Sequence, residues 1–275
     1  MFIEILLAIL LGCIAGTITG LIPGIHINLV AISIFTLSPF LLEFTSPLIL
    51  AVFIISMSIT HTFTDFIPSC FLGAPESDTA LSVLPAHRLL LRGRAYEAIF
   101  LTVIGGLFSL ILTIILIPPI ILTLKEIYPV LRSYIGYILI IISLFLIFKD
   151  KKSKYFALVV FLLSGVLGLA TFKLKLNEPL FPLLSGLFGT SLLILSIKDK
   201  IKIPKQEITK IYIDKIMGFK SIISSVIVGT FSSFLPGLGP SQAAIITTQF
   251  FKKITIKSFL IIVGALNTIN MIVSF

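Results

Sequence analysis

The chain has 275 residues, of which 57% are hydrophobic and only 12% are charged, and its formal net charge is +9. Soluble domains carry about a quarter charged residues, so this composition excludes an ordinary soluble domain and indicates a polytopic membrane protein. The basic residues lie in short connectors. That placement is typical of the cytoplasmic side of a membrane protein and argues against nucleic acid as a partner.

Apolar segments follow one another from the first residues onward. The chain begins MFIEILLAIL, with Glu4 and no basic stretch, so we expect no cleaved signal peptide and a first segment that stays in the membrane. We expect an all-α fold of about eight to ten membrane segments in the cell membrane. The candidate segments are 3–22, 27–42, 47–67, 98–124, 134–148, 155–172, 180–197, 219–235 and 257–275, with a shorter apolar piece at 241–251.

Connectors and prolines predict how these segments are joined. Pro118, Pro119 and Pro129 fall near segment ends and favour a break between 98–124 and 134–148. If the connectors 68–97, 149–154 and 198–218 are all cytoplasmic, the segments between them form two helix pairs. We interpret 198–218, which has many lysines and three acidic residues, as a solvated cytoplasmic link between two halves of the protein.

The two ends of the chain resemble each other. Residues 16–24 read GTITGLIPG and residues 229–237 read GTFSSFLPG, and each is followed by an apolar segment with a polar residue next to threonine. We therefore predict two related repeats, at 1–97 with a Gly-Ala-Pro loop and at 219–275. Between them we place membrane helices at 98–197 and a basic linker at 198–218.

The Pro-Gly sequences interrupt apolar stretches, and irregular backbone at membrane depth survives only where protein or water surrounds it. Pro240 and Ser241 suit the start of a new half-helix, whose N-terminus can accept an anion. Paired broken helices are typical of secondary transporters, whereas a Pro-kinked helix packed for shape is the alternative. The predicted substrate-binding residues are Pro23, Gly24, His26, Asn28, Pro236, Gly237, Gly239, Pro240, Ser241 and Gln242.

Polar residues inside apolar segments form a second candidate site, because an ionisable group there is costly. Asp65 is four residues after His61 and shares its helix face, so the pair could bind a cation or carry a proton. Structural hydrogen bonds and interhelical packing are the alternatives. The predicted ion-coupling residues are His61, Thr62, Asp65, Asn267, Thr268 and Asn270. We predict no metal site and no cofactor, and interpret Cys13 and Cys70 as small buried hydrophobic residues.

Three stretches carry a family resemblance. The sequences GTITGLIPG, GAPESDTALSVLPAHRLLLRGRAYEA and LPGLGPSQAAI are similar to the large permease subunit of tripartite tricarboxylate transporters, the TctA-type family. The resemblance implies an ion-driven carrier for carboxylates such as citrate, working with a small membrane subunit and an extracytoplasmic binding protein. The chain departs from the family at Ile25–Asn28, at Glu76 and Asp78, and at its C-terminal end. We expect a divergent, archaeal-type member that is either short or continues in C-terminal helices beyond this sequence.

These observations favour a secondary transporter for a small organic anion, coupled to Na⁺ or H⁺. ATP-driven transport by this chain is not expected, since no Gly-rich loop with Lys-Ser/Thr is present. An intramembrane enzyme is one alternative, and Ser241 with His61 would be its only dyad. A channel or a non-transporting membrane scaffold is the other alternative.

Overall fold

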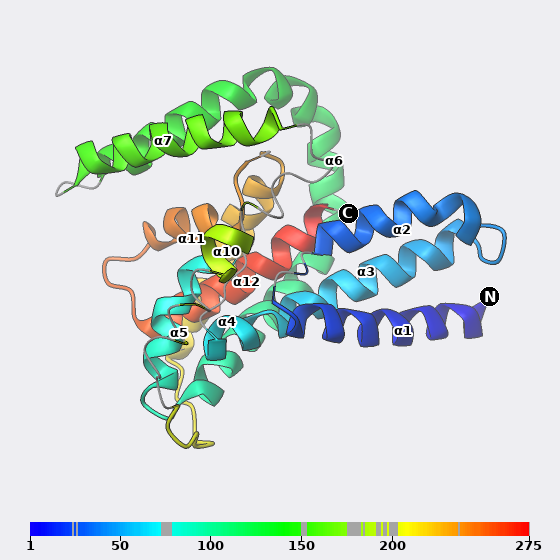
Figure 1. Cartoon of the computed structure of the whole chain (residues 1–275), viewed down its shortest axis with the longest axis horizontal. Coiled ribbons are helices and arrows are strands. Elements are labelled where there is room, and N and C mark those ends of the chain that lie inside the picture. The colour runs from blue at the N-terminus through cyan, green and yellow to red at the C-terminus, as the bar shows by residue number, and fades with distance from the viewer. Residues whose placement is uncertain are drawn as a thin grey trace.

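The computed structural model describes residues 1–23, 25, 27–72, 79–149, 153–174, 183, 185–190, 194, 197, 203–235 and 237–274. These residues form helices and connecting segments, with no strand among them, which confirms the all-α prediction. The helices in Figure 1 are α1 (Phe2–Leu21), α2 (Ile27–Leu41), α3 (Pro47–Thr64), α4 (Phe66–Leu72), α5 (Val83–Leu90), α6 (Ala95–Lys149), α7 (Lys154–Phe172), α10 (Lys215–Ser233), α11 (Pro240–Thr248) and α12 (Ile256–Ser274). Short helical turns lie at Ala80–Ser82 and Ser185–Thr190.

Seven stretches of the described chain are long and apolar enough to cross a membrane, which confirms a multi-pass membrane protein. They are Phe2–Leu21, Pro47–Leu72, Ala95–Thr123, Lys125–Lys149, Lys154–Phe172, Lys215–Ser233 and Ile256–Ser274. Helix α2 has 15 residues, fewer than the roughly 20 that a straight span needs. Half of the predicted segment 180–197 lies outside the described residues, so the total of eight to ten segments stays a prediction.

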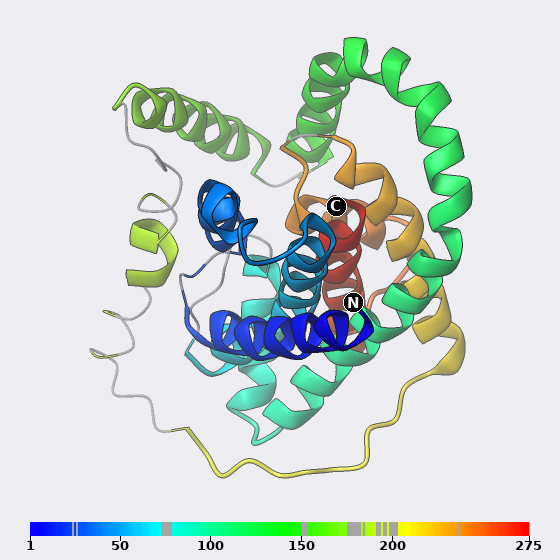
Figure 2. The same cartoon turned by 90° about the vertical axis from the view of Figure 1, so that its right-hand side faces the viewer.

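Helix α6 corrects the predicted break between 98–124 and 134–148. It is one helix of 55 residues with Pro118, Pro119 and Pro129 inside it, and it curves around one side of the molecule (Figure 2). Proline removes one backbone donor, yet its fixed φ is compatible with a helix, so it bends a helix that other contacts hold. The two predicted membrane spans are present, but a helical bend joins them instead of a loop.

The first three helices pack through small residues. Gly12, Gly16 and Gly20 of α1 lie so close to α3 that a Cβ atom at any of them would collide with Phe53 O, Met57 O or Thr64 Oγ1, respectively. Residue numbers rise together along the two helices, so α1 and α3 run parallel. Helix α2, which lies between them in the chain, therefore runs in the opposite direction, and Pro23 lies just after the end of α1.

The last three helices repeat this order with the direction reversed. Gly229 of α10 packs against Leu266 and Ile269 of α12, while Ile222 packs against the cluster that holds Leu260, so α10 and α12 also run parallel. Helix α12 is the most deeply buried of the seven spans and packs on α3, α6, α10 and α11. Side-chain contacts show that α3 and α12 are antiparallel, because Phe66 packs against Ile262 whereas Met57 shares a cluster with Met271. The duplication itself stays a prediction.

The connector before α10 is largely exposed, and it is also attached to the core, which the sequence did not suggest. Residues 203–214 are extended (Figure 2) and lie against the turn between α5 and α6. Gln206 Oε1 accepts a hydrogen bond from Ala95 N at 2.9 Å, and Glu207 N donates to Gly93 O at 2.8 Å. Ile211 and Ile213 pack against a buried core cluster. Partly buried apolar side chains and these two hydrogen bonds attach the segment to the core, while most of its side chains stay exposed.

Candidate functional site

The centre of the candidate site is the crossing of α3 and α12. Thr62 Oγ1 and Thr268 Oγ1 lie 3.2 Å apart and share a hydrogen bond. Asn267 Nδ2 donates to Asp65 Oδ2 at 2.8 Å and to Thr62 O at 3.4 Å. All four side chains are at most 3% exposed. The structure thus brings together the two polar steps that the sequence predicted, one from each end of the chain.

Local structure explains why these residues meet. Asp65 is the residue at which α3 ends and α4 begins, and its backbone N–H donates to His61 O. Thr62 lies one turn earlier on α3, and Asn267 and Thr268 are adjacent on α12. Because α3 and α12 are antiparallel, a single crossing point places Asp65 opposite Asn267 and Thr62 opposite Thr268. A buried carboxylate needs such donors, since burial without them is costly.

His61 extends the polar cluster toward α1. Its Nδ1 lies 3.0 Å from Thr19 Oγ1, and the side chain is only 1% exposed. The close approach of Gly16 and Gly20 to α3 makes this contact possible. Thr19 was absent from the predicted site, although it lies inside the GTITG motif between these two glycines. A polar residue between two helix-contact glycines was the signal that pointed to it.

Asn270 lies one turn beyond the crossing and faces the second break. Ser233 Oγ, in the last turn of α10, donates to Asn270 Oδ1 at 3.3 Å. The next residue, Met271, packs with Ile27 at the start of α2. Asn267, Thr268, Asn270 and Met271 of α12 therefore contact α3, the end of α10 and the start of α2. The helix ends that flank the two breaks thus meet the same stretch of α12.

The second break confirms the predicted start of a half-helix. Helix α10 ends at Ser233 and α11 begins at Pro240, with Gly239 as its N-cap in an extended conformation. Gly237 has φ of +91°, a left-handed conformation that favours glycine, and this explains why the chain can turn there. Ser241 and Gln242 lie in the first turn of α11, and Gln242 is exposed.

Several predicted residues cannot be placed in the site. Pro23 lies just after the end of α1, but Gly24, His26 and Pro236 fall outside the described residues, as does the Asn28 side chain. The Gly-Ala-Pro loop, with Glu76 and Asp78, falls outside them too. The substrate-binding role of residues 23–28 and 236–242 therefore stays a prediction, supported by the helix ends that flank both breaks.

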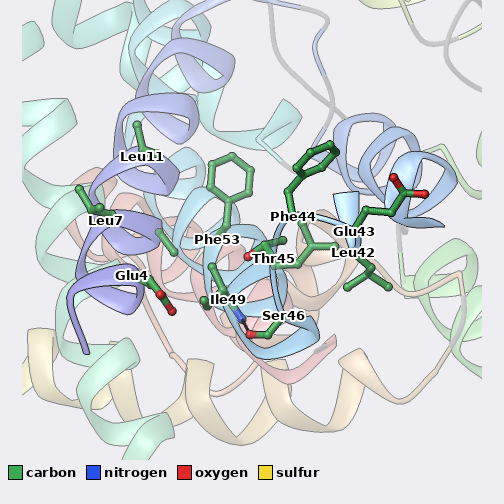
Figure 3. A pocket seen from close by; sticks show the side chains of 12 residues that line it. Glu4, Leu7, Leu11, Leu42, Glu43, Phe44, Thr45, Ser46, Ile49 and Phe53 are labelled. Carbon is green, nitrogen blue, oxygen red and sulfur yellow. Dashed lines mark hydrogen bonds between the residues drawn. The ribbon is translucent and has the colours of Figure 1, made fainter. Parts of the chain in front are cut away.

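A separate cavity of about 690 Å³ lies between the start of α1 and the turn that joins α2 to α3 (Figure 3). Its lining is mainly apolar, and Glu4, Glu43, Thr45 and Ser46 supply the polar groups. No predicted site residue lines this cavity. It opens at the membrane end where α3 begins, well before His61 on the same helix, and it is therefore distinct from the polar crossing.

The crossing has the chemistry of a site for a small hard cation or a proton. It combines one carboxylate, an amide and two hydroxyl groups, and oxygen atoms of these kinds suit such cations. Among the described residues, no group of three or more His, Cys, Asp or Glu side chains could hold a metal ion. The crossing therefore offers one carboxylate with hydroxyl and amide groups around it.

Fold and site together define a multi-pass membrane protein with a buried polar crossing between oppositely directed helices. The chain belongs to the tripartite tricarboxylate transporter TctA family, whose family model matches residues 6–275. This is a family of transporters and not of enzymes, which removes the intramembrane-enzyme alternative.

A curated relative supports the archaeal character expected from the sequence. The chain is 37% identical to the uncharacterized protein MJ1079 of Methanocaldococcus jannaschii over 260 residues. The aligned region covers 92% of this chain and 63% of the relative, so the chain spans less than two thirds of the relative's length. No solved structure matches the chain significantly.

Proposed function

We propose that the protein is the permease of a secondary transporter for a small organic anion, specifically a carboxylate, coupled to Na⁺ or H⁺. The observation that carries this proposal is the contact between Asp65 and Asn267, buried between helices that run in opposite directions. Secondary transporters with inverted repeats hold substrate and coupling ion at the interface of two such units. The tricarboxylate transporter family supports a carboxylate as substrate.

The division of labour follows from charge. Asp65 is the acidic side chain at the crossing, so it takes the coupling cation, with the hydroxyl groups of Thr62 and Thr268 beside it. The half-helix α11 presents its N-terminus at the second break, and the partial positive charge there favours a substrate carboxylate. Asn270 and Ser233 connect the two places. A small membrane subunit and an extracytoplasmic binding protein are the proposed partners.

Ligand-induced thermal stabilisation of the purified protein tests this function. Di- and tricarboxylates are compared in Na⁺ and in K⁺ and at several pH values. A ligand at 100 times its dissociation constant adds about 2.7 kcal/mol to the unfolding free energy. We expect one carboxylate class to raise the unfolding temperature, and the increase to grow with Na⁺ or with acidity. The absence of any shift across the whole panel would contradict the proposal.

Glu43→Gln is a matched control for Asp65→Asn in this experiment. Both variants neutralise one carboxylate, but Glu43 is exposed and lines the separate cavity. We expect Glu43→Gln to keep the cation dependence of stabilisation and Asp65→Asn to abolish it. Equal behaviour of the two variants would move the coupling site away from the crossing.

A further inference from the structure

Glu97 is a buried carboxylate that the proposed transport site does not use. It lies in the first turn of α6 and is 1% exposed. Arg94 forms an ion pair with its Oε2, and Lys257, in the first turn of α12, lies 3.0 Å from its Oε1. Removing a carboxylate from water is costly, and two cations from different parts of the chain compensate for it here.

The same group of residues fixes the connector 203–214. Lys257 Nζ also donates to Tyr212 O at 2.8 Å, and Gln206 bonds the turn just before Glu97. The ion pairs and these hydrogen bonds together join α6, α12 and the connector at one end of the molecule. Arg88, Arg92 and Lys205 lie in the same connecting segments, so the positive-inside rule makes this end cytoplasmic.

The path from Glu97 to the polar crossing is filled by two buried layers. Along α12, Lys257 is followed by Leu260 and Ile261 in one apolar cluster, then by Ile262, Val263 and Leu266 in a second, and then by Asn267. Along α4 and α3 the order is the same, with Cys70 in the first cluster and Phe66 in the second. Ten residues of helix separate Lys257 from Asn267, about 15 Å.

The other side of the crossing is covered more thinly. Asn270 and Ser233 are only half-buried, and among the described residues the apolar cluster beyond them has three buried members, Ile27, Met57 and Met271, with partly buried side chains packed around them. Two apolar clusters and a layer of ion pairs thus separate the crossing from the cytoplasm, while its other side is covered by less. This asymmetry matches a carrier, which exposes its central site to one side of the membrane at a time.

We propose that Glu97, held by Arg94 and Lys257, is the cytoplasmic gate of the carrier. The gate rests on the proposed transport function, because opening it gives the α3–α12 crossing access to the cytoplasm. When the gate opens, the first turn of α12 moves away from α6 and the connector, and the Lys257 contacts to Glu97 and Tyr212 separate. In the structure described here the gate is closed.

Cys70 is a native reporter for this gate. It lies in the apolar cluster directly inside the ion pairs, is 1% exposed, and its Sγ is 3.7 Å from Ala86 O. Cys13 on α1 is the other cysteine of the chain, and it is only partly buried. A small maleimide is added on the cytoplasmic side, and the labelling rates of Cys70 and Cys13 are measured by mass spectrometry. Opening of the gate raises the Cys70 rate alone, whereas general loosening of the fold raises both rates.

We expect Glu97→Gln to accelerate labelling of Cys70 by about tenfold or more, because loss of one partner of a buried ion pair raises the population of the open state. The Cys13 rate stays unchanged. Lys257→Gln keeps the Arg94–Glu97 pair but removes the contacts of α12 to Glu97 and to Tyr212 O, so it accelerates labelling of Cys70 as well. Arg88→Gln, an exposed charge on α5, leaves both rates as in the wild type.

Two results would overturn the gate: an unchanged Cys70 rate in Glu97→Gln, or an equal acceleration of both cysteines. Labelling needs no transported substrate, so it tests the gate separately from the proposed function. If Cys70 responds as expected while no carboxylate stabilises the protein, the gate stands and the substrate assignment fails. If a carboxylate binds while the Cys70 rate is unchanged, the transport proposal stands and the gate fails.

Discussion

The contact between Asp65 and Asn267 predicts the result of placing a second charge at the α3–α12 crossing. Asn267 Nδ2 lies 2.8 Å from Asp65 Oδ2, and both side chains are 3% exposed. Asn267→Asp replaces this donor by a carboxylate, and two like charges 2.8 Å apart repel by about 6 kcal/mol at an effective dielectric constant of ~20. Relaxation and water entry reduce this repulsion, so we expect the unfolding free energy to fall by about 3–5 kcal/mol.

The double variant Asp65→Asn/Asn267→Asp tests the origin of this loss. It restores one carboxylate and one amide with their positions exchanged, so we expect more than half of the lost stability to return. Asp65→Asn alone leaves two amides that can still bond, at a cost of about 1 kcal/mol. Thermal unfolding of the wild type and the three variants gives the coupling energy of the pair. A double variant no more stable than Asn267→Asp would refute the direct interaction.

Three smaller predictions concern a close helix contact, the attachment of the connector 203–214 and the N-cap of α10. Gly264→Ala pushes a methyl group into Thr102 O on α6, and we expect it to lower the unfolding free energy by about 1–3 kcal/mol. A Cβ atom at Gly136 would have nothing within 4 Å, so we expect Gly136→Ala to raise the unfolding free energy by up to about 1 kcal/mol. Equal effects of the two variants in unfolding experiments would argue against the close contact of Gly264 with α6. Gln206→Ala should cost about 1–2 kcal/mol and speed proteolysis within 203–214, and unchanged cleavage would show that the connector is not held there. Asp214→Ala removes the N-cap of α10, and we expect it to lower the unfolding free energy by about 1 kcal/mol. Asp214→Asn keeps a capping oxygen and should largely avoid this loss. An equal loss in both variants would assign the effect to the charge of Asp214 and not to capping.

Features set by local sequence were predictable. Apolar runs of spanning length gave the membrane class, and Pro240 after Gly239 gave the start of α11, because both signals depend only on neighbouring residues. The polar steps at Thr62 and Thr268 were recognised as equivalent positions in two repeats. Their direct contact did not follow from that comparison, since it depends on the antiparallel crossing of two buried helices.

Features set by distant packing were missed. Pro129 favours a helix end locally, yet α6 continues through it. The lysines of 198–218 indicated a solvated link, and nothing in the sequence indicated that Gln206 and Ile211 attach the largely exposed residues 203–214 to the core. Glu97 drew no attention because its partner Lys257 is 160 residues away. A charged residue at the start of two different apolar spans was the available signal.

Gradient-driven uptake by the protein in liposomes tests directly whether Asp65 couples carboxylate transport to a cation. The carboxylate found by thermal stabilisation is supplied outside, with or without an imposed Na⁺ or H⁺ gradient, and the wild type is compared with Asp65→Asn. We expect the wild type to accumulate the carboxylate under the gradient, and Asp65→Asn only to exchange it without accumulation. Accumulation by Asp65→Asn equal to that of the wild type would contradict the assignment of the coupling ion to the α3–α12 crossing.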